Sequence, residues 1–411
     1  MRVLILGGGY AGIFAASNLC KNKNVQVTLV NDGPQLQLLQ NIHRVASGEL
    51  QPRDITLDIQ GILGKDVIFV KGKSEKVDLV AKQAEIVFTE SGMVQIIQYD
   101  YLIIAIGATN AYFGIKGARE NTLSLRSVDD SIKLDTIIES LPQGSILTIA
   151  GGGATGLSLT GALSEKYGNK IRIRIIEAQK EVLTGWDPRI IEMVKGKLEK
   201  NKNLEILRGK PIIEIGPHSV TLSSGETLQT NLTVWTAGIG GQDLNIIPEV
   251  KRSGSGRIIV NKYSQVLRSD GGGVFDNVFA IGDISAFPLD DEGKMSPQLA
   301  QFAARQARNV AKNILRKESG EEMIELEYLQ KGQIISLGTN CMGILNGFPI
   351  SGWLCENTED FVIDNYIKAI LNRGEGLEGM VYDGNSIGTE IVTSINFISY
   401  LCRRLMIPSS H

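Results

Sequence analysis

The sequence predicts an α/β fold with two strand–turn–helix units of the same design, the second inserted into the first, followed by a C-terminal α+β domain. Two observations lead to this class. The chain of 411 residues is too long for one hydrophobic core. An apolar strand also runs into three glycines and then into a helical pattern twice, at "RVLILGGGYAG" and at "ILTIAGGGATG". Because strands alternate with helices around both turns, we expect two α/β units.

The elements of the first unit follow one another in a regular order. A strand, a helix and a second strand come first, then a strand-rich stretch and a further strand. These predicted elements are the strand 2–7, the helix 10–22, the strand 25–31, the strand-rich residues 51–98 and the strand 99–108.

The second unit repeats this pattern, and the chain then returns to the first unit before it reaches the C-terminal domain. The second unit is predicted from the strand 146–150, the helix 155–168, the strand 170–178, the helix 189–201 and the strand 231–239. The return consists of the strand 274–281 and a helix that begins at about Pro297. From about Tyr328, glycine-punctuated strands lead to a helical segment at 386–407.

Both glycine-rich turns match the pattern Gly-x-Gly-x-x-Gly between a strand and a helix. The first glycine allows the tight turn, the second lets the backbone approach a pyrophosphate, and the third lets the helix pack against the strand. The helix N-terminus adds free N–H groups and the positive end of its dipole. Two such turns predict two bound dinucleotides, one in each Rossmann-like unit, at Gly7, Gly9 and Gly12 and at Gly151, Gly153 and Gly156.

The strand after each turn ends in a residue that could bind a ribose. In the second unit this residue is Glu177, 21 positions after Gly156. A carboxylate there accepts hydrogen bonds from both ribose hydroxyls and repels a 2′-phosphate, so we expect NADH rather than NADPH. In the first unit the strand ends in Asn31 and Asp32 follows, and either could bond a ribose hydroxyl.

A flavin contact is predicted where the chain returns to the first unit. Asp283 follows a strand and a glycine in "NVFAIGDIS", where its carboxylate can accept from a ribityl hydroxyl. The helix from about Pro297 would direct its first N–H groups at the flavin pyrimidine oxygen and stabilise the anionic reduced ring. We therefore predict segments 1–110 and 241–327 for FAD, 111–240 for NADH and 328–411 for the C-terminal domain.

Composition excludes several other classes of function. A net charge of −3 leaves no basic surface for nucleic acid, and no run of about 18 apolar residues is present to cross a bilayer. The three histidines lack metal-site spacing, and the four cysteines form no CxxC motif, which predicts reduced thiols in an intracellular chain. Cys341 and Cys355 could approach each other, with a structural role or as free thiols rather than as a redox-active pair.

The sequence resembles the two-dinucleotide flavoproteins and, within them, the type II NADH dehydrogenases, which are single-subunit NADH:quinone oxidoreductases that pump no protons. The resemblance covers about residues 1–315, and the more discriminating pieces are "YFGIKG" and the Ala300-Gln301 pair. The matching stretches are "GGGYAG", "VTLVN", "HRVASGEL", "YDYLIIAIGATNAYFGIKG", "GGGATG", "VWTAGI", "NVFAIGD" and "AQFAARQA".

The resemblance implies FAD and NADH as cofactors and a ping-pong reaction, in which a hydride passes from NADH to the flavin and two electrons then reach a quinone. It nominates Gln301 and Arg305 near the quinone and Ser158 near the nicotinamide. It also implies peripheral binding to the cytoplasmic side of the cell membrane, with a homodimer possible. Further cofactor-binding residues expected are Tyr10, Ala11, Ala105, Gly107, Ala154, Thr155, Ala237, Gly238, Leu299 and Ala300.

The chain departs from the family pattern at three places. Ser158 stands where the family carries a glutamate, and a hydroxyl cannot relay a proton as a carboxylate does, so we expect a modified proton route or weaker activity unless Ser158 is a plain helix residue. Arg305 replaces a second glutamine, with Gln306 one position later. In "GPQLQLLQNIHRVASG" the chain has glutamines and leucines where the family has an aromatic and Thr-Pro stretch over the flavin. Only backbone contacts to the flavin, from Leu39 or Gln40, are then expected at this place.

Apolar residues recur at steps of three and four near the C-terminus, beside Arg403 and Arg404. This stripe predicts an amphipathic helix that docks on a membrane surface, or that packs on the domain or on a dimer partner. The stripe consists of Ile387, Ile391, Ile395, Ile398, Cys402 and Leu405.

Two other functions stay open on the sequence. One is a soluble NAD(P)H-dependent flavoprotein reductase with a sulfur compound or a small redox protein as acceptor, including an enzyme like sulfide:quinone oxidoreductase. The other is a non-catalytic flavin-binding redox sensor or scaffold, which Ser158 and the altered "LQLLQN" stretch keep open.

Overall fold

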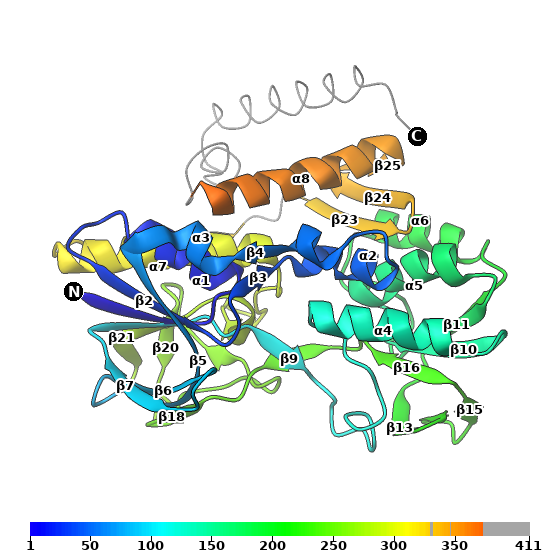
Figure 1. Ribbon diagram of the computed structural model, residues 1–411, viewed down its shortest axis with the longest axis horizontal. Helices are drawn as coiled ribbons and strands as arrows, with labels where there is room; N and C mark the ends of the chain where they lie inside the picture. Colours follow the sequence, from blue (N-terminus) through cyan, green and yellow to red (C-terminus); the bar gives the residue numbers. More distant parts are fainter. Residues whose placement is uncertain (329–331, 346, 373–411) are drawn as a thin grey trace.

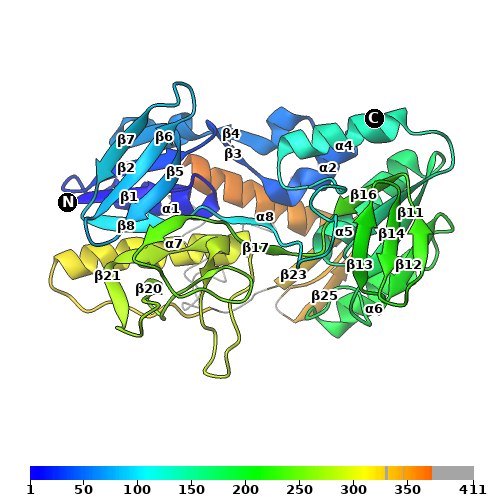
Figure 2. The ribbon, with the colours of Figure 1, turned by 90° about the horizontal axis from the view of Figure 1, so that it is seen from below.

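Two sheets with parallel strands at their centres lie side by side, and a small layer of strands and one helix packs across them (Figures 1 and 2). The computed structural model describes residues 1–328, 332–345 and 347–372. The predicted α/β class with two Rossmann-like units is confirmed by this arrangement. In the described ranges, no helix combines the length and the apolar character needed to cross a membrane.

The first unit is a sheet whose central strands are covered on both faces, which explains why they read as continuous apolar runs. Val3 and Ile5 pack against the helices, whereas Leu4 and Leu6 face a second apolar cluster. The helices are α1 (Tyr10–Leu19), α3 (Ile59–Leu63) and α7 (Ala300–Glu318). The strands in spatial order are β20 (Gln265–Leu267), β21 (Val274–Ala280), β8 (Tyr101–Ile104), β1 (Arg2–Leu6), β2 (Gln26–Asn31), β5 (Val67–Asp78), β6 (Gln83–Phe88) and β7 (Val94–Gln98), and β18 (Asn245–Ile247) also pairs with β5.

The second unit is a four-stranded parallel sheet with helices against it and a small antiparallel sheet beside it. The strands of the parallel sheet in order are β12 (Leu204–Arg208), β11 (Ile171–Glu177), β10 (Ser145–Ala150) and β16 (Leu232–Trp235). The helices are α4 (Val128–Ser140), α5 (Ala154–Tyr167) and α6 (Pro188–Leu198), and the small sheet contains β13 (Ile212–Gly216), β14 (Ser219–Leu222) and β15 (Thr227–Gln229).

The chain passes into and out of the second unit through one pair of antiparallel strands, β9 (Ala108–Asn110) and β17 (Ile239–Gly241). The domain boundaries at 110 and 240 stay predictions, and this strand pair supports them. The remaining short elements are β3 (Gln35–Gln37), β4 (Thr56–Asp58), β19 (Ile258–Ile259), β22 (Ser285–Ala286), α2 (Ile42–Ala46) and the 3-10 helices η1 (Leu39–Asn41), η2 (Pro52–Ile55), η3 (Gly64–Asp66) and η4 (Gly282–Ile284).

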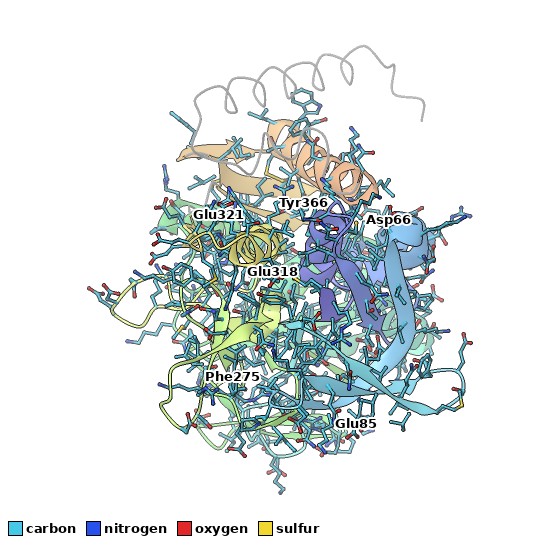
Figure 3. The ribbon with its side chains drawn as sticks, turned by 90° about the vertical axis from the view of Figure 1, so that its left-hand side faces the viewer. Asp66, Glu85, Phe275, Glu318, Glu321 and Tyr366 are labelled. Atoms are coloured by element: carbon cyan, nitrogen blue, oxygen red, sulfur yellow. A yellow bond between two sulfur atoms is a disulfide. The ribbon has the colours of Figure 1, made fainter. Side chains whose placement is uncertain are left out.

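The C-terminal layer touches both units. An antiparallel sheet of β23 (Gly332–Leu337), β24 (Asn340–Leu345) and β25 (Phe348–Ser351) packs on α5 and α6 of the second unit. The helix α8 (Trp353–Leu371) runs back over the first unit, and Tyr366 lies on this helix (Figure 3). The rings of Tyr366 and Tyr10 pack edge to face, with their centres 6.0 Å apart. The predicted apolar stripe at 387–405 lies outside the described residues.

Helix α7 begins later than predicted, at Ala300 instead of about Pro297. The residues before it are extended because other segments bind them. The Arg257 guanidinium donates to the carbonyl and hydroxyl of Ser296, and the side chain of Gln298 donates to the Asp283 carbonyl at 3.0 Å. These tertiary hydrogen bonds outweigh the helix-starting preference of Pro297.

Candidate active site

The first glycine-rich turn is tight because its outer glycines have no room for a side chain. A Cβ at Gly7, where φ is +105°, would lie 2.3 Å from the carbonyl oxygen of Ala105. A Cβ at Gly12 would lie 1.9 Å from the carbonyl oxygen of Gly7, so the helix packs directly on the turn. Gly9 differs, because a Cβ there would meet nothing within 4 Å. The middle position therefore faces open space, as the approach of a dinucleotide requires.

The second turn repeats this geometry. A Cβ at Gly151, where φ is +113°, would lie 2.5 Å from Cα of Ala237, and one at Gly156 would lie 2.2 Å from the carbonyl oxygen of Gly151. Gly153 again faces open space. The helices that begin at these turns, α1 and α5, have no side-chain cap. Their first N–H groups are therefore available to an anion, and both turns fit a pyrophosphate.

Glu177 and Asn31 occupy equivalent positions and bind the two glycine-rich turns in the same way. Glu177 ends β11, and its carboxylate accepts from the backbone N–H groups of Gly152 at 2.7 Å and Gln179 at 2.8 Å. Asn31 ends β2, and its side-chain oxygen accepts from the Gly8 N–H at 2.8 Å. Its amide nitrogen donates to a backbone carbonyl. Each side chain makes one hydrogen bond at each end, so the Asn31 amide and the Glu177 carboxylate both keep capacity for a ribose hydroxyl.

Asp283 lies in η4, within electrostatic reach of the half-buried Arg126 and the buried Arg257. Burial raises the pKa of its carboxyl, and the charges of Arg126 and Arg257 act in the opposite direction. The Asp283 side chain has no hydrogen bond with another residue in the described part of the chain, and Arg126 Nε is likewise buried without a partner there. A carboxylate in this situation fits a ligand with hydroxyl groups, as predicted for a ribityl chain.

Gln306 positions this aspartate and is a site residue that sequence reasoning missed. It is fully buried in α7, at 0% exposure. Its side-chain oxygen accepts from the Gly282 N–H at 2.8 Å, and its nitrogen donates to the hydroxyls of Ser264 at 3.0 Å and Ser285 at 2.9 Å. The amide therefore anchors the residue before Asp283. In the sequence it stood out only as a glutamine one position after Arg305.

The three predicted catalytic residues lie on two helices. Gln301 and Arg305 are one turn apart on α7 and thus share a face. The Arg305 guanidinium stacks over the Tyr328 ring, 5.6 Å from its centre. Ser158 is buried on α5 in the other unit and has no hydrogen bond with either residue. Their roles stay predictions.

The remaining predicted cofactor residues border the two turns or the start of α7. Tyr10 begins α1 and donates its hydroxyl to the side chain of Gln40, while Asp32, directly after β2, is exposed. Gly238 stands against the ring of Phe113, and a Cβ there would lie 2.7 Å from it. The others in these places are Ala11, Ala105 and Gly107 in the first unit, Ala154, Thr155 and Ala237 in the second, and Leu299 and Ala300 at α7.

Cys341 on β24 and Cys355 on α8 form a disulfide, with Cα atoms 5.5 Å apart. The prediction of reduced thiols is wrong for this pair, because the turn back from β25 into α8 brings the two cysteines together. Both residues are buried, at 2% and 0% exposure. Buried cysteines react poorly, which favours the structural role over redox exchange.

Sequence comparison relates most of the chain to one group of flavoproteins. The pyridine nucleotide-disulphide oxidoreductase profile matches residues 1–307. The type II NADH:quinone oxidoreductase of Staphylococcus aureus (strain NCTC 8325 / PS 47) is 30% identical over 382 residues, covering 85% of this chain and 91% of the relative.

Solved structures share the fold at lower identity. The chain resembles NDH2 from Plasmodium falciparum in complex with NADH, with a TM-score of 0.79 at 18% identity, covering 91% of this chain and 96% of that one. It also resembles the sulfide:quinone oxidoreductase from Aquifex aeolicus, with a TM-score of 0.75 at 19% identity over 90% of this chain and 92% of that one. At such identities these structures establish the fold alone.

Proposed function

Since this chain belongs to the pyridine nucleotide-disulphide oxidoreductases, and within them to the type II NADH:quinone oxidoreductases, we propose how its residues divide the work of that reaction. The chain is an FAD-dependent oxidoreductase that takes electrons from NADH and gives them to a quinone. The observation that carries the assignment of sites is the pair of uncapped helix N-termini, each beside a glycine that faces open space.

We assign FAD to the first turn. The N-terminus of α1 would hold its pyrophosphate, and Asp32 or Asn31 would bond its adenosine ribose. Asp283, anchored through Gln306 and Gly282, would hold the ribityl chain. When bound, FAD supplies the two-electron chemistry that links a hydride donor to a quinone.

We assign NADH to the second turn. The N-terminus of α5 would hold the pyrophosphate, and Glu177 would accept from the ribose hydroxyls. Because two backbone N–H groups fix the Glu177 carboxylate before any ligand arrives, its negative charge is already in position to disfavour a 2′-phosphate. This supports the preference for NADH.

The acceptor side is assigned to the half-buried face that Gln301 and Arg305 share at the start of α7. Gln301 and Arg305 would orient the quinone oxygens by donating hydrogen bonds, and Arg305 keeps its guanidinium in place by stacking on Tyr328. Ser158 offers only a hydroxyl near the second turn, so a proton would have to reach the site through water or another side chain. A modified proton route is therefore part of the proposal.

We also propose that the protein binds the cytoplasmic side of the cell membrane peripherally. The C-terminal layer supports this, because several large apolar side chains on β25 and α8 are exposed, namely Phe348, Trp353, Leu354, Val362 and Leu371. Deletion of the residues after Gly384 should shift the protein from the membrane pellet to the supernatant. Unchanged pelleting would remove the C-terminal segment as the anchor.

The function is tested by anaerobic titration of the purified protein with NADH, followed by addition of a short-chain quinone. We expect a yellow protein that NADH bleaches and the quinone restores. Restoration by sulfur compounds but not by quinone would favour the soluble reductase. A protein that takes up no flavin would contradict the proposal, and a yellow protein that NADH fails to bleach would favour the redox sensor.

A further inference from the structure

The strand beside Glu177 carries an arginine directly opposite it. In the parallel pair of β11 and β12, Glu177 is the register partner of Arg208. Register partners on neighbouring strands lie about 4.8 Å apart and point to the same side of the sheet. A ligand group bound by the Glu177 carboxylate is therefore within reach of the long Arg208 side chain.

Arg208 is held by another acid. Glu181 follows Glu177 by one loop, and its Oε2 atom accepts from Arg208 Nη1 at 3.3 Å and from Lys195 Nζ at 2.6 Å. Lys195 comes from α6, so one carboxylate gathers two cations from two different elements. These contacts hold the pKa of Glu181 below its ordinary value, so its charge is present at neutral pH.

There is room beside this cluster. Lys195 and Arg208 line a cavity of about 220 Å³ between α6 and β12, together with one acid, Glu199, and apolar side chains that include Leu198. In NADP-binding proteins an arginine near the ribose accommodates the 2′-phosphate. Here Arg208 lies beside Glu177, and Glu181 neutralises part of its charge.

We propose that Glu181 is a second specificity-determining residue, which keeps Arg208 and Lys195 from binding the 2′-phosphate of NADPH. This inference rests on the assignment of NADH to the second turn. Glu177 repels the phosphate directly, and Glu181 withholds the cations that would attract it. The chain thus contains a latent phosphate site, which neutralisation of Glu181 strengthens while Glu177 still opposes it.

The test compares two ligands that differ by one phosphate, ADP-ribose and 2′-phospho-ADP-ribose, by calorimetric binding to the flavin-loaded protein. In Glu181→Gln we expect the Kd of the 2′-phosphorylated ligand to fall by about fivefold to tenfold, up to about 1.4 kcal/mol. The Kd of ADP-ribose should change by less than about twofold. Since exposed charges act through solvent, the gain should shrink at high salt.

The matched control is Glu192→Gln, the same loss of charge at an exposed position of α6 that has no ion pair with a described residue. It should change the two Kd values by the same small factor. Glu181→Gln/Arg208→Met should lose the gain of the single variant. Thermal unfolding of each variant checks folding, and surface ion pairs of this kind contribute little to it.

The outcomes separate this inference from the assignment on which it rests. If the unmodified protein binds no ADP-ribose, both the assignment of NADH to the second turn and the inference are refuted. If the unmodified protein binds ADP-ribose, but Glu181→Gln changes the Kd values of the two ligands no differently from Glu192→Gln, the inference alone is overturned. A gain that survives loss of Arg208 would likewise overturn it.

Discussion

Replacement of Gln306 by leucine tests whether the buried amide in α7 holds the flavin site together. The substitution keeps nearly the same volume and removes every hydrogen bond of the side chain. It leaves the Gly282 N–H and the hydroxyls of Ser264 and Ser285 without the partner they have in the wild-type protein. We expect lower stability and poor flavin retention.

The magnitude follows from these three groups. A buried donor left without a partner costs about 1–3 kcal/mol. The Gly282 N–H belongs to a fixed turn and cannot move to another acceptor, whereas the two hydroxyls can rotate toward neighbouring carbonyls. The first unit should therefore lose about 2–4 kcal/mol of unfolding free energy, most of it from Gly282.

The assay is urea unfolding of the apoprotein, combined with the flavin content of the purified holoprotein. Gln301→Leu is the matched control, because it makes the same change five residues earlier on α7, at a half-buried side chain without hydrogen bonds to the described residues. This control should stay within about 0.5 kcal/mol of wild type, keep its flavin and slow reoxidation by quinone.

A Gln306→Leu protein with wild-type unfolding and full flavin content would refute the reasoning, since the amide would then be dispensable. A protein that is destabilised but binds FAD with unchanged affinity would refute only the link from Gln306 through Gly282 to Asp283.

The remaining predictions concern the two turns and one buried histidine. Gly9→Val should abolish flavin uptake, and Gly153→Val should raise the KM for NADH at least about tenfold. Neither variant should lose thermal stability, because a Cβ at either position meets nothing within 4 Å. If the two effects were exchanged, our assignment of the two cofactors would be reversed. Glu177→Ala should raise the KM for NADH about tenfold with little change in kcat, and an unchanged KM would remove it from the ribose. Burial and, to a smaller extent, the charge of Arg44 lower the pKa of His43 from 6.5 to about 4. Between pH 6.5 and pH 4 the unfolded chain therefore binds a proton at His43 that the folded chain does not bind, so the free energy of unfolding should fall as the pH drops through this range. The urea midpoint of His43→Gln should fall less over this range, and parallel curves for the two proteins would contradict the burial argument.

The features that were predictable from the sequence are those that local geometry dictates. A glycine with positive φ between a strand and a helix leaves a pattern that can be recognised over six residues, as at Gly7 and Gly151. Glu177 was predictable because the end of the next strand lies beside the turn in any such unit.

The features that were missed depend on partners distant in the chain. Gln306 bonds to Ser264 and Gly282, which lie 42 and 24 positions away, so no local spacing marks it as buried. The start of α7 was placed too early because Arg257 binds Ser296 from 39 positions away. The disulfide of Cys341 joins two different elements across 14 positions, and its spacing alone does not distinguish a bond from two thiols.

The antiparallel pair of β9 and β17 has a consequence for protein engineering. Asn110 and Ile239 are register partners, so the two ends of the chain segment between them, which forms the second unit, lie next to each other. A segment with adjacent ends can be removed and its flanks rejoined by a short linker without distorting the host. The second unit could therefore be exchanged as a cassette for one from a relative with another coenzyme preference, while the first unit keeps its own sheet intact.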